Sequence, residues 1–497
     1  MIVSVYLEKQ NPLYTNLDVV KGKVILKVPT STSVSQVVVK LESECKTRLT
    51  APNLPGRSER QRVVLEVHKL LYKTLTVWPP QHMHGQVTKN SFTLNAGQYD
   101  WPFEFKIPLN NQCWQQTGYQ PAVTFGGLQM EIAKPPTQHT KQTLPPTLNG
   151  FPGEAEIRYF VKVTVARPQF YKENLRAWAH FNFLPIEPPP GCRDGEAYAR
   201  RQHQFLPETG PERKKSIFGA LSKSSSSGPG SPPVGSLGPP PRFAVDVRLP
   251  NPATLTCNDE LPLRILLKQL SERTANVYLQ MLQIELIGYT KVRAHEFSRT
   301  ESNSWIVVSL SNMAIPIGSP SDAVDTETAI NPEYWMGNPL PNTVAPSFET
   351  CSISRHYELE VRVGLGYGTY QHGKDQLVVL PLRLPVRVLS GIKPPGELLK
   401  AMEADTVPGT GLKPPLVVTP GPSAPGPSHL NTPVSPSGPP PPQGQVYQQP
   451  SAEYEDAPPS YEDAVGQNLP PIDGPRRAYA PPPFPEGEPR FEGDRKS

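Results

Sequence analysis

Apolar and polar residues alternate with a period of two along most of the chain. In Tyr159–Val165 every second residue is apolar, whereas Lys162 and Thr164 between them are polar. The same alternation recurs in three later segments, at 243–249, 357–363 and 382–388. Because successive side chains of a strand point to opposite faces, this pattern predicts half-buried strands of antiparallel sheets with one face on a core. Helical spacing is nearly absent, and only Pro395–Ala404 is predicted to form a short helix.

The predicted strands fall into two blocks, which we interpret as two tandem β-sandwiches in an all-β fold. The first block covers residues 1–187 and the second residues 242–391, each long enough for a sandwich of about seven strands or more. Residues 188–241 between them are rich in Pro, Ser and Gly, and residues 392–497 are rich in Pro. Segments with so little apolar content cannot bury a core, so we predict a disordered linker and a disordered tail.

Charge and cysteine content exclude some classes of function. The 497 residues include 49 basic and 45 acidic ones, a net charge of +4 that is too balanced to indicate a nucleic-acid partner. The five cysteines are odd in number and far apart, which is typical of reduced thiols in a cytosolic protein. We find no signal peptide and no stretch of ~20 apolar residues, so we expect a cytoplasmic protein that is only recruited to membranes.

The tail contains a Pro-Pro-x-Tyr element, the form of peptide that WW domains bind, at residues 458–461. Pro458 and Pro459 pre-set a polyproline II helix, so little ordering entropy is lost when they lie across an aromatic groove. Tyr461 follows in the same short segment and can fill a neighbouring pocket with its hydroxyl toward water. The sequence therefore predicts that Pro458, Pro459 and Tyr461 bind a WW domain.

Such an element can also arise by chance, since 64 of the 497 residues are Pro. Its setting favours function, because few aliphatic residues surround it and acidic residues follow it directly. Glu453–Ala457 repeats the tyrosine and the acidic residues without the prolines, and Pro481–Phe484 has prolines but no tyrosine. We treat neither of these near copies as a full site.

Several segments, in order along the chain, resemble stretches of the arrestin family: Tyr14–Val24, Ser91–Phe105, Leu144–Tyr159 and Tyr357–Val361. In the first, a turn precedes a Gly-x-Val strand, and the second has the family's Gly, aromatic, Pro-Phe and Phe ahead of Pro108. The third contains Leu-Pro-Pro-Thr, with Thr147 where the family usually has Ser, and leads to Ile-Arg-Tyr. Together with the Pro-Pro-x-Tyr tail, the set resembles a fungal-type α-arrestin of the arrestin-related trafficking adaptor group.

This resemblance implies arrestin lobes at 1–187 and 242–391 and the role of a non-catalytic adaptor. Members of the group recognise plasma-membrane transporters or receptors and recruit a HECT-type ubiquitin ligase, whose WW domains hold the Pro-Pro-x-Tyr element. The cargo is then ubiquitinated and internalised by endocytosis. We therefore expect Pro458, Pro459 and Tyr461 to contact the ligase, and we expect the protein in the cytoplasm, recruited to the plasma membrane and endosomes. A single short element binds weakly, so a flexible tail should help by raising its effective concentration.

Candidate phosphorylation sites lie in the predicted linker and tail. Ser216 follows a basic run, and Ser231, Thr432 and Ser435 each precede a proline. A phosphate adds close to two negative charges, which could bridge to nearby arginines and change how the lobes sit. Dipeptides of this kind are common in disordered segments, so we predict only that some of the linker serines are modified.

No pattern in the sequence indicates catalysis, a metal site or a cofactor. The close pair His82 and His84 has no Cys or acidic residue nearby to complete a metal site. Gly364–Gly368 does not fit a dinucleotide-binding turn, and no nucleophile–base arrangement is recognisable. An enzyme is thus the least favoured class. The main alternative to the ligase adaptor is an arrestin-like scaffold for a membrane sensor of ambient pH or nutrients, itself regulated by ubiquitination. The two differ in whether transporter turnover depends on Tyr461.

Overall fold

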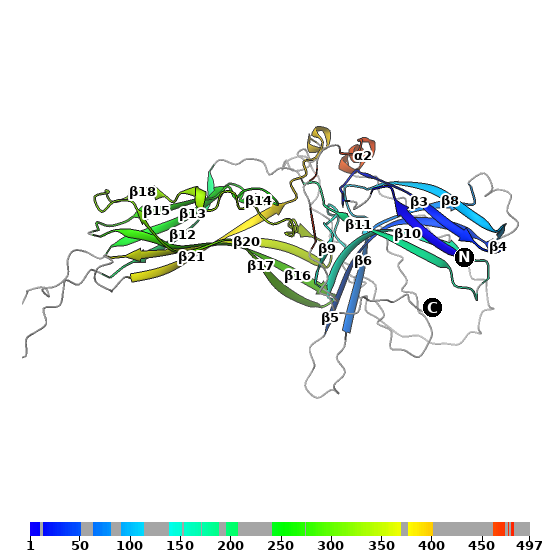
Figure 1. Cartoon of the computed structure of the whole chain (residues 1–497), viewed down its shortest axis with the longest axis horizontal. Helices are drawn as coiled ribbons and strands as arrows, with labels where there is room; N and C mark the ends of the chain where they lie inside the picture. The colour runs from blue at the N-terminus through cyan, green and yellow to red at the C-terminus, as the bar shows by residue number, and fades with distance from the viewer. Residues whose placement is uncertain are drawn as a thin grey trace, which may run out of the picture.

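The computed structural model describes most of both predicted blocks and a short part of the tail. The described residues are 1–9, 13–50, 63–80, 91–113, 139–151, 154–169, 171–187, 195–206, 241–273, 275–368, 376–400, 461–472, 476 and 479–481. Strands dominate them, and they form two lobes that lie end to end along the long axis of the molecule (Figure 1). The predicted all-β fold with two tandem sandwiches is confirmed.

The N-terminal lobe packs a three-stranded sheet against a larger one. The smaller sheet has the order β1-β3-β8, formed by Ile2–Leu7, Val19–Val28 and Gly97–Lys106. The larger has the order β2-β11-β10-β5-β6, formed by Leu13–Tyr14, Leu175–Phe183, Ala155–Ala166, Gln36–Thr50 and Val63–Trp78. Three short strands complete the lobe: β9 (Leu148–Phe151) beside β10, and the pair β4 (Thr32–Val34) and β7 (Phe92–Leu94).

The C-terminal lobe repeats this two-sheet plan. One sheet has the order β12-β13-β15-β18, formed by Glu196–Gln204, Arg242–Pro250, Arg264–Gln269 and Glu327–Ala329. The other has the order β14-β21-β20-β16-β17, formed by Thr254–Thr256, Gln376–Leu389, Ile353–Tyr367, Val277–Ala294 and Phe297–Ile317. The short strand β19 (Phe348–Glu349) pairs with β20, and Pro332–Tyr334 form the 3₁₀ helix η3. Pairing is antiparallel except for β2 with β11 and β14 with β21, where a short strand runs parallel to its neighbour.

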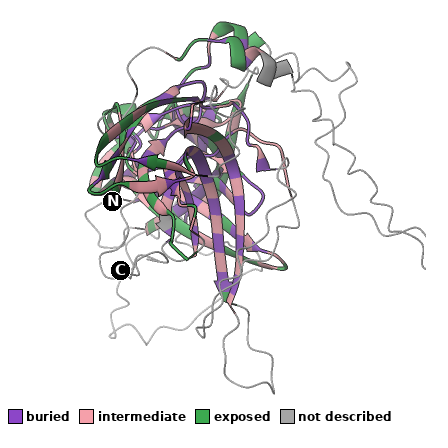
Figure 2. Cartoon of the chain, turned by 90° about the vertical axis from the view of Figure 1, so that its right-hand side faces the viewer, coloured by how far each residue is buried: buried purple, intermediate pink, exposed green. Residues whose placement is uncertain are grey.

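Burial follows the alternation read from the sequence (Figure 2). In β10 the apolar residues from Tyr159 to Val165 are at most 1% exposed at every second position, whereas Lys162 and Thr164 are half-buried. Each buried Val or Leu side chain stabilises the fold by about 1.5–3 kcal/mol relative to an exposed one. Asp246 of β13 and Glu360 of β20 depart from the pattern, because both are buried although they occupy polar positions. Asp246 has a partner for its charge. Arg200 of β12 covers it and donates two hydrogen bonds of 2.6 Å to its carboxylate.

The predicted linker at 188–241 is wrong for residues 196–204. They form β12, which pairs with β13 along its whole length, from Glu196 opposite Pro250 to Gln204 opposite Arg242. The segment has few large apolar side chains, so its sequence shows only a weak pattern for a strand. It is held instead by the backbone ladder and by ion pairs such as Arg200–Asp246. Most of the remaining linker, 188–194 and 207–240, lies outside the described residues.

The predicted disordered tail at 392–497 is also wrong in part. Residues 396–400 are helical, which confirms the short helix expected there. Further along, Tyr461–Asn468 form helix α2, which lies against the N-terminal lobe where the two lobes meet (Figure 1). Propensity alone does not explain α2, because an isolated helix of this length is unstable in water. Its contacts with the lobe must supply the stability.

Candidate functional site

The structure describes one of the residues predicted to act in binding or regulation. Tyr461 is the first residue of α2, and its side chain is not described. Pro458 and Pro459 lie outside the described residues, as do the candidate phosphorylation sites Ser216, Ser231, Thr432 and Ser435. The described part of 461–481, hereafter the docked tail segment, begins at the tyrosine of the Pro-Pro-x-Tyr element. It is therefore the candidate functional site.

The C-terminal end of α2 is held by a lysine from the N-terminal lobe. Lys106, the last residue of β8, donates from Nζ to the carbonyl oxygen of Gln467 at 2.7 Å and to that of Leu469. The last carbonyls of a helix lack partners within the helix and carry partial negative charge. A lysine ammonium supplies both a donor and the complementary charge, so it fixes where α2 ends.

Apolar residues of the docked tail segment extend the core of the N-terminal lobe. Leu469 is 7% exposed, and Val465 and Ile472 pack against the same core while partly buried. Gly466 lies so close to Leu17 that an added Cβ would be 3.2 Å from its Cδ2 atom. Only Val465 lies within α2, because the helix ends at Asn468, and Leu469 and Ile472 follow it in non-helical chain interrupted by Pro470 and Pro471. No helical spacing in the sequence therefore indicated the docking.

A bidentate ion pair between Arg476 and Asp18 anchors the docked tail segment. Arg476 donates from Nη2 to Oδ1 of Asp18 at 2.6 Å and from Nη1 to Oδ2, and it also donates to the carbonyl oxygen of Leu13 at 3.0 Å. The Asp18 side chain is 3% exposed and that of Arg476 15%. Asp18 also accepts a hydrogen bond from the backbone amide of Thr15. Pairing a nearly buried carboxylate with a guanidinium in this geometry gives a strong, directional contact.

The far end of the segment reaches both lobes. The hydroxyl of Tyr479 donates to the carbonyl oxygen of Thr147 at 2.6 Å, and burial raises the pKa of this tyrosine. The hydroxyl of Thr147 in turn accepts from the amide of Phe183. The amide of Ala480 donates to the carbonyl oxygen of Asn342 in the C-terminal lobe. The segment thus runs from β8 to the boundary between the lobes.

The residues of the N-terminal lobe that contact the docked tail segment include members of two segments that resemble arrestins. Asp18 belongs to Tyr14–Val24, and Thr147 belongs to Leu144–Tyr159. In the latter, the Tyr159 hydroxyl donates to the carbonyl oxygen of Pro145 at 2.6 Å, which fixes the loop that receives Tyr479. The features that identify the family in sequence therefore also form the surface on which the tail lies.

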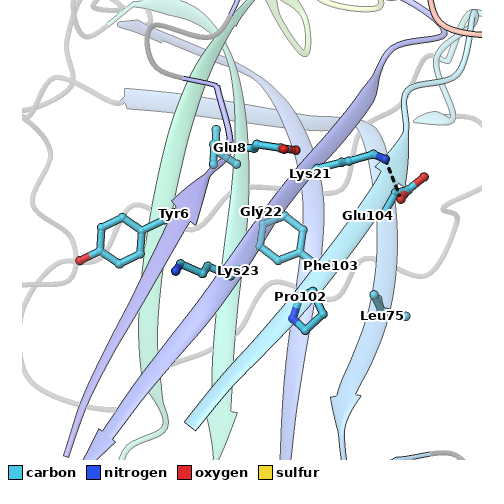
Figure 3. Close-up of a pocket in the computed structure, with 10 residues that line it drawn as sticks. Tyr6, Glu8, Lys21, Gly22, Lys23, Leu75, Pro102, Phe103 and Glu104 are labelled. Atoms are coloured by element: carbon cyan, nitrogen blue, oxygen red, sulfur yellow. Dashed lines mark ion pairs between the residues drawn. The ribbon is translucent and has the colours of Figure 1, made fainter. Parts of the chain in front are cut away.

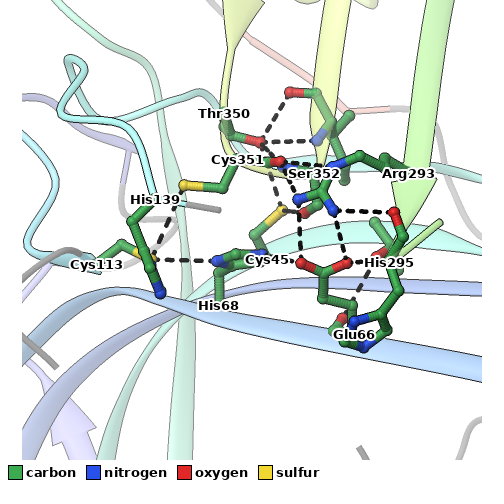
Figure 4. Close-up of polar contacts among 12 residues, drawn as sticks. Cys45, Glu66, His68, Cys113, His139, Arg293, His295, Thr350, Cys351 and Ser352 are labelled. Atoms are coloured by element: carbon green, nitrogen blue, oxygen red, sulfur yellow. Dashed lines mark hydrogen bonds and ion pairs between the residues drawn. The ribbon is translucent and has the colours of Figure 1, made fainter. Parts of the chain in front are cut away.

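A second buried polar site joins the lobes around Glu66 of β6. Arg293 of β16 donates to both carboxylate oxygens, at 3.1 and 3.2 Å, and the backbone amide of His295 donates to one of them. His68 lies 2.7 Å away on the other side. Burial opposes ionisation of Glu66, but the bonds from His68 and His295 and the charge of Arg293 outweigh it and lower its pKa to about 2. We call this arrangement the Glu66 contact; two histidines and two cysteines gather beside it (Figure 4).

A groove lies on the outside of the N-terminal lobe. It has a volume of about 610 Å³ and lies over β1, β3 and β8, with the ring of Phe103 beside Gly22 (Figure 3). A Cβ on Gly22 would lie 2.2 Å from the carbonyl oxygen of Tyr6, which explains the glycine. Lys21 and Glu104 form an exposed ion pair at 3.3 Å. The lining residues that carry a charge or a hydroxyl are Tyr6, Glu8, Lys21, Lys23 and Glu104.

Comparison with known proteins identifies the N-terminal lobe. Residues 3–127 match the N-terminal domain of arrestin (or S-antigen). The N-terminal lobe therefore resembles an arrestin domain. A segment of 111 residues is also 29% identical to Arrestin-related trafficking adapter 10 of Lachancea thermotolerans. That match covers 21% of this chain and 26% of the relative, so the chain spans about a quarter of the length of the curated relative it matches. Among the described residues of the chain, no helix combines the length and apolar character needed to cross a membrane.

Proposed function

We propose that this protein is a non-catalytic adaptor that recruits a HECT-type ubiquitin ligase to membrane cargo. Pro458, Pro459 and Tyr461 bind a WW domain of the ligase, and the lobes recognise a plasma-membrane transporter or receptor. The cargo is then ubiquitinated and internalised. The protein acts from the cytoplasm, at the plasma membrane and on endosomes, and phosphorylation at Ser216, Ser231, Thr432 or Ser435 adjusts it.

The observation that supports this proposal is the position of the Pro-Pro-x-Tyr element beside the docked tail segment. Pro459 is two residues from Tyr461, so at most ~7 Å of chain separates it from the start of α2. Lys106, Asp18 and Thr147 hold the residues that follow. A ligase bound to the element is therefore kept close to the N-terminal lobe. A short tether of this kind gives a higher effective concentration than a free tail of about a hundred residues would.

The first test is a titration of WW domains against the full-length protein and two variants. We expect Tyr461→Ala to abolish binding. Tyr454→Ala is the matched control, because Tyr454 is also followed by acidic residues in the tail but lacks the two prolines. It should bind as the wild type does. Binding that is unchanged in Tyr461→Ala, or lost equally in both variants, would contradict the assignment of the WW-binding residues.

A second test in cells separates the adaptor from the scaffold alternative. Surface transporters are quantified by mass spectrometry in cells that produce the wild type or Tyr461→Ala as their only copy. The adaptor proposal requires at least one transporter whose ubiquitination and turnover fall in the variant. If WW binding is lost but the turnover of every transporter is unchanged, the adaptor proposal is wrong and an arrestin-like scaffold regulated by its own ubiquitination is favoured.

A further inference from the structure

Side chains with metal-binding atoms converge where the two lobes meet (Figure 4). Their ligand atoms all lie within 4.8 Å of one another, and the cluster comprises His68, Cys113, His139 and Cys351. We call it the interlobe Cys/His cluster. His68 lies on β6, whereas Cys351 lies between β19 and β20 of the other lobe. His139 is half-buried and the other members are buried.

The distances within the cluster are close to those of a tetrahedral zinc site. Bonds of ~2.3 Å to sulfur and ~2.0–2.1 Å to nitrogen place neighbouring ligand atoms about 3.3–3.8 Å apart. Sγ of Cys113 lies 3.2 Å from Nδ1 of His68, 3.0 Å from Nδ1 of His139 and 3.9 Å from Sγ of Cys351. These three separations differ from that range by about 0.1–0.3 Å, and the remaining pairs of ligand atoms lie within 4.8 Å of each other.

The tautomer of His68 is set by the Glu66 contact. Nε2 of His68 lies 2.7 Å from Oε1 of Glu66, so the proton of the neutral ring belongs on Nε2. Nδ1, which faces Cys113, then carries a lone pair. A carboxylate that orients a histidine through its other nitrogen is the usual support of a zinc-bound imidazole. Arg293 holds that carboxylate in turn.

The surroundings of Cys351 suit a metal-bound thiolate. The backbone amide of Thr140 donates to Sγ of Cys351 at 3.2 Å, and a donor in this position stabilises negative charge on the sulfur. The thiolate is the form of cysteine that binds metals. Two thiolates would balance the charge of one Zn²⁺, so the loaded site would be neutral overall, as suits a buried position.

We propose that the interlobe Cys/His cluster binds one Zn²⁺ ion as a structural site. Ligands of the Cys₂His₂ type are typical of structural zinc, and four protein ligands leave no open position for catalysis. Binding displaces the two thiol protons to solvent. Three of the ligands come from the N-terminal lobe and Cys351 comes from the C-terminal lobe. The ion therefore links the lobes, and its binding free energy stabilises their arrangement. This proposal does not depend on the proposed adaptor function.

The competing interpretations are a metal-free hydrogen-bonded cluster and a disulfide between Cys113 and Cys351. In a metal-free cluster, the Cys113 thiol would donate to the lone pair on Nδ1 of His68 and accept from Nδ1–H of His139. A disulfide would remove both sulfur ligands. The three possibilities differ in metal content and in the number of free thiols, so one set of measurements separates them.

The experiment measures zinc in full-length protein, purified under reducing conditions, incubated with Zn²⁺ and dialysed against metal-free buffer. We expect about one zinc per chain by plasma mass spectrometry for the wild type. Cys257→Ser is the matched control, because Cys257 is a buried cysteine whose thiol donates to the carbonyl oxygen of Val344, away from the cluster. It should retain the zinc. Cys351→Ser should lose it, as should His139→Ala, whose half-buried side chain makes misfolding less of a concern.

Cobalt provides a readout that does not depend on any variant folding. In the wild type, Co²⁺ should give the visible bands of tetrahedral coordination and a thiolate-to-metal charge-transfer band, and Zn²⁺ should displace it. A wild type that holds no stoichiometric zinc and shows no such bands overturns the proposal. So does a folded Cys351→Ser variant that binds zinc as the wild type does, or a disulfide between Cys113 and Cys351 in the purified protein.

Discussion

The N-terminal lobe is approached by two distant parts of the chain, and the two contacts differ in how they are held. At the Glu66 contact the carboxylate is completely buried and receives donors from Arg293, His68 and His295. The two arginine side chains are about equally exposed, 16% for Arg293 and 15% for Arg476, but Arg476 belongs to a short segment at the edge of the lobe. A buried, fully partnered contact opens only when the lobes come apart. A peripheral segment held by a few separate anchors can open alone, because its free energy of opening is local.

The largest loss of folding stability is expected from Glu66→Gln, which would break the Glu66 contact. The substitution removes the completely buried carboxylate that both Arg293 and His68 contact. Removing one partner of a buried ion pair costs about 3–5 kcal/mol. Denaturant unfolding of the full chain should show this loss. Glu104→Gln, which removes the exposed pair with Lys21, should change stability by less than about 1 kcal/mol. Equal effects of the two substitutions would contradict the distinction between buried and peripheral contacts.

The folding stability should also depend on pH through Glu187, which lies at the junction of the lobes. Burial raises the pKa of this carboxyl to about 7, against the lowering effects of the Ser390 amide and the Arg387 charge. A folded pKa above the unfolded value means that the folded state binds more protons. The stabilising contribution is therefore present below the unfolded pKa, 4.5, and is lost as the pH rises to about 7. A shift of this size corresponds to about 3 kcal/mol.

Glu187→Gln isolates this effect from other titrations. Unfolding free energies of the wild type and the variant are compared at pH 5 and pH 8. The variant should gain stability relative to the wild type on going to the higher pH. A difference between the two proteins that does not change with pH would show that Glu187 does not titrate in this range.

Arg476→Ala tests whether the docked tail segment opens on its own. The change leaves the Asp18 carboxylate 3% exposed with only the Thr15 amide as a nearby donor. We expect α2 to lose about 2 kcal/mol of protection, less than for Glu66→Gln because Glu66 binds both Arg293 and His68 whereas Asp18 pairs with Arg476. Hydrogen exchange at residues 461–472 should accelerate while β5 and β10 keep their protection. Acceleration in both regions would show that the segment and the lobe form one cooperative unit.

The smallest effect is expected from Tyr479→Phe. It removes the hydrogen bond to the Thr147 carbonyl but keeps the buried ring. One neutral hydrogen bond contributes about 1 kcal/mol. Exchange of the Ala480 amide should accelerate by roughly five- to tenfold, with little change at α2. Tyr171→Phe, at an exposed position, serves as the control. No change at Ala480 would indicate that the ring, and not the hydroxyl, anchors this end.

The local sequence pattern was sufficient to predict a strand wherever the burial of a residue depends on its neighbours in sequence. The alternation in Tyr159–Val165 places these residues in β10, and the same holds for the later strands β13, β20 and β21. Strand β12 was missed because its strength lies in pairing with β13 and in the Arg200–Asp246 bonds. The contacts of Val465, Leu469 and Ile472 with the lobe were not predicted, because these apolar residues are few and lie among prolines.

The sequence by itself determined the all-β class, the two lobes, the resemblance to arrestins and the Pro-Pro-x-Tyr element, because each depends on residues close together in the chain. Tertiary structure alone decided that the tail docks and that the interlobe Cys/His cluster exists. Asp18 and Arg476 are 458 positions apart, and Cys113 and Cys351 are 238 apart. No local spacing relates such residues. They meet only because the sheets place β6, the end of β8 and the start of β20 at one boundary between the lobes.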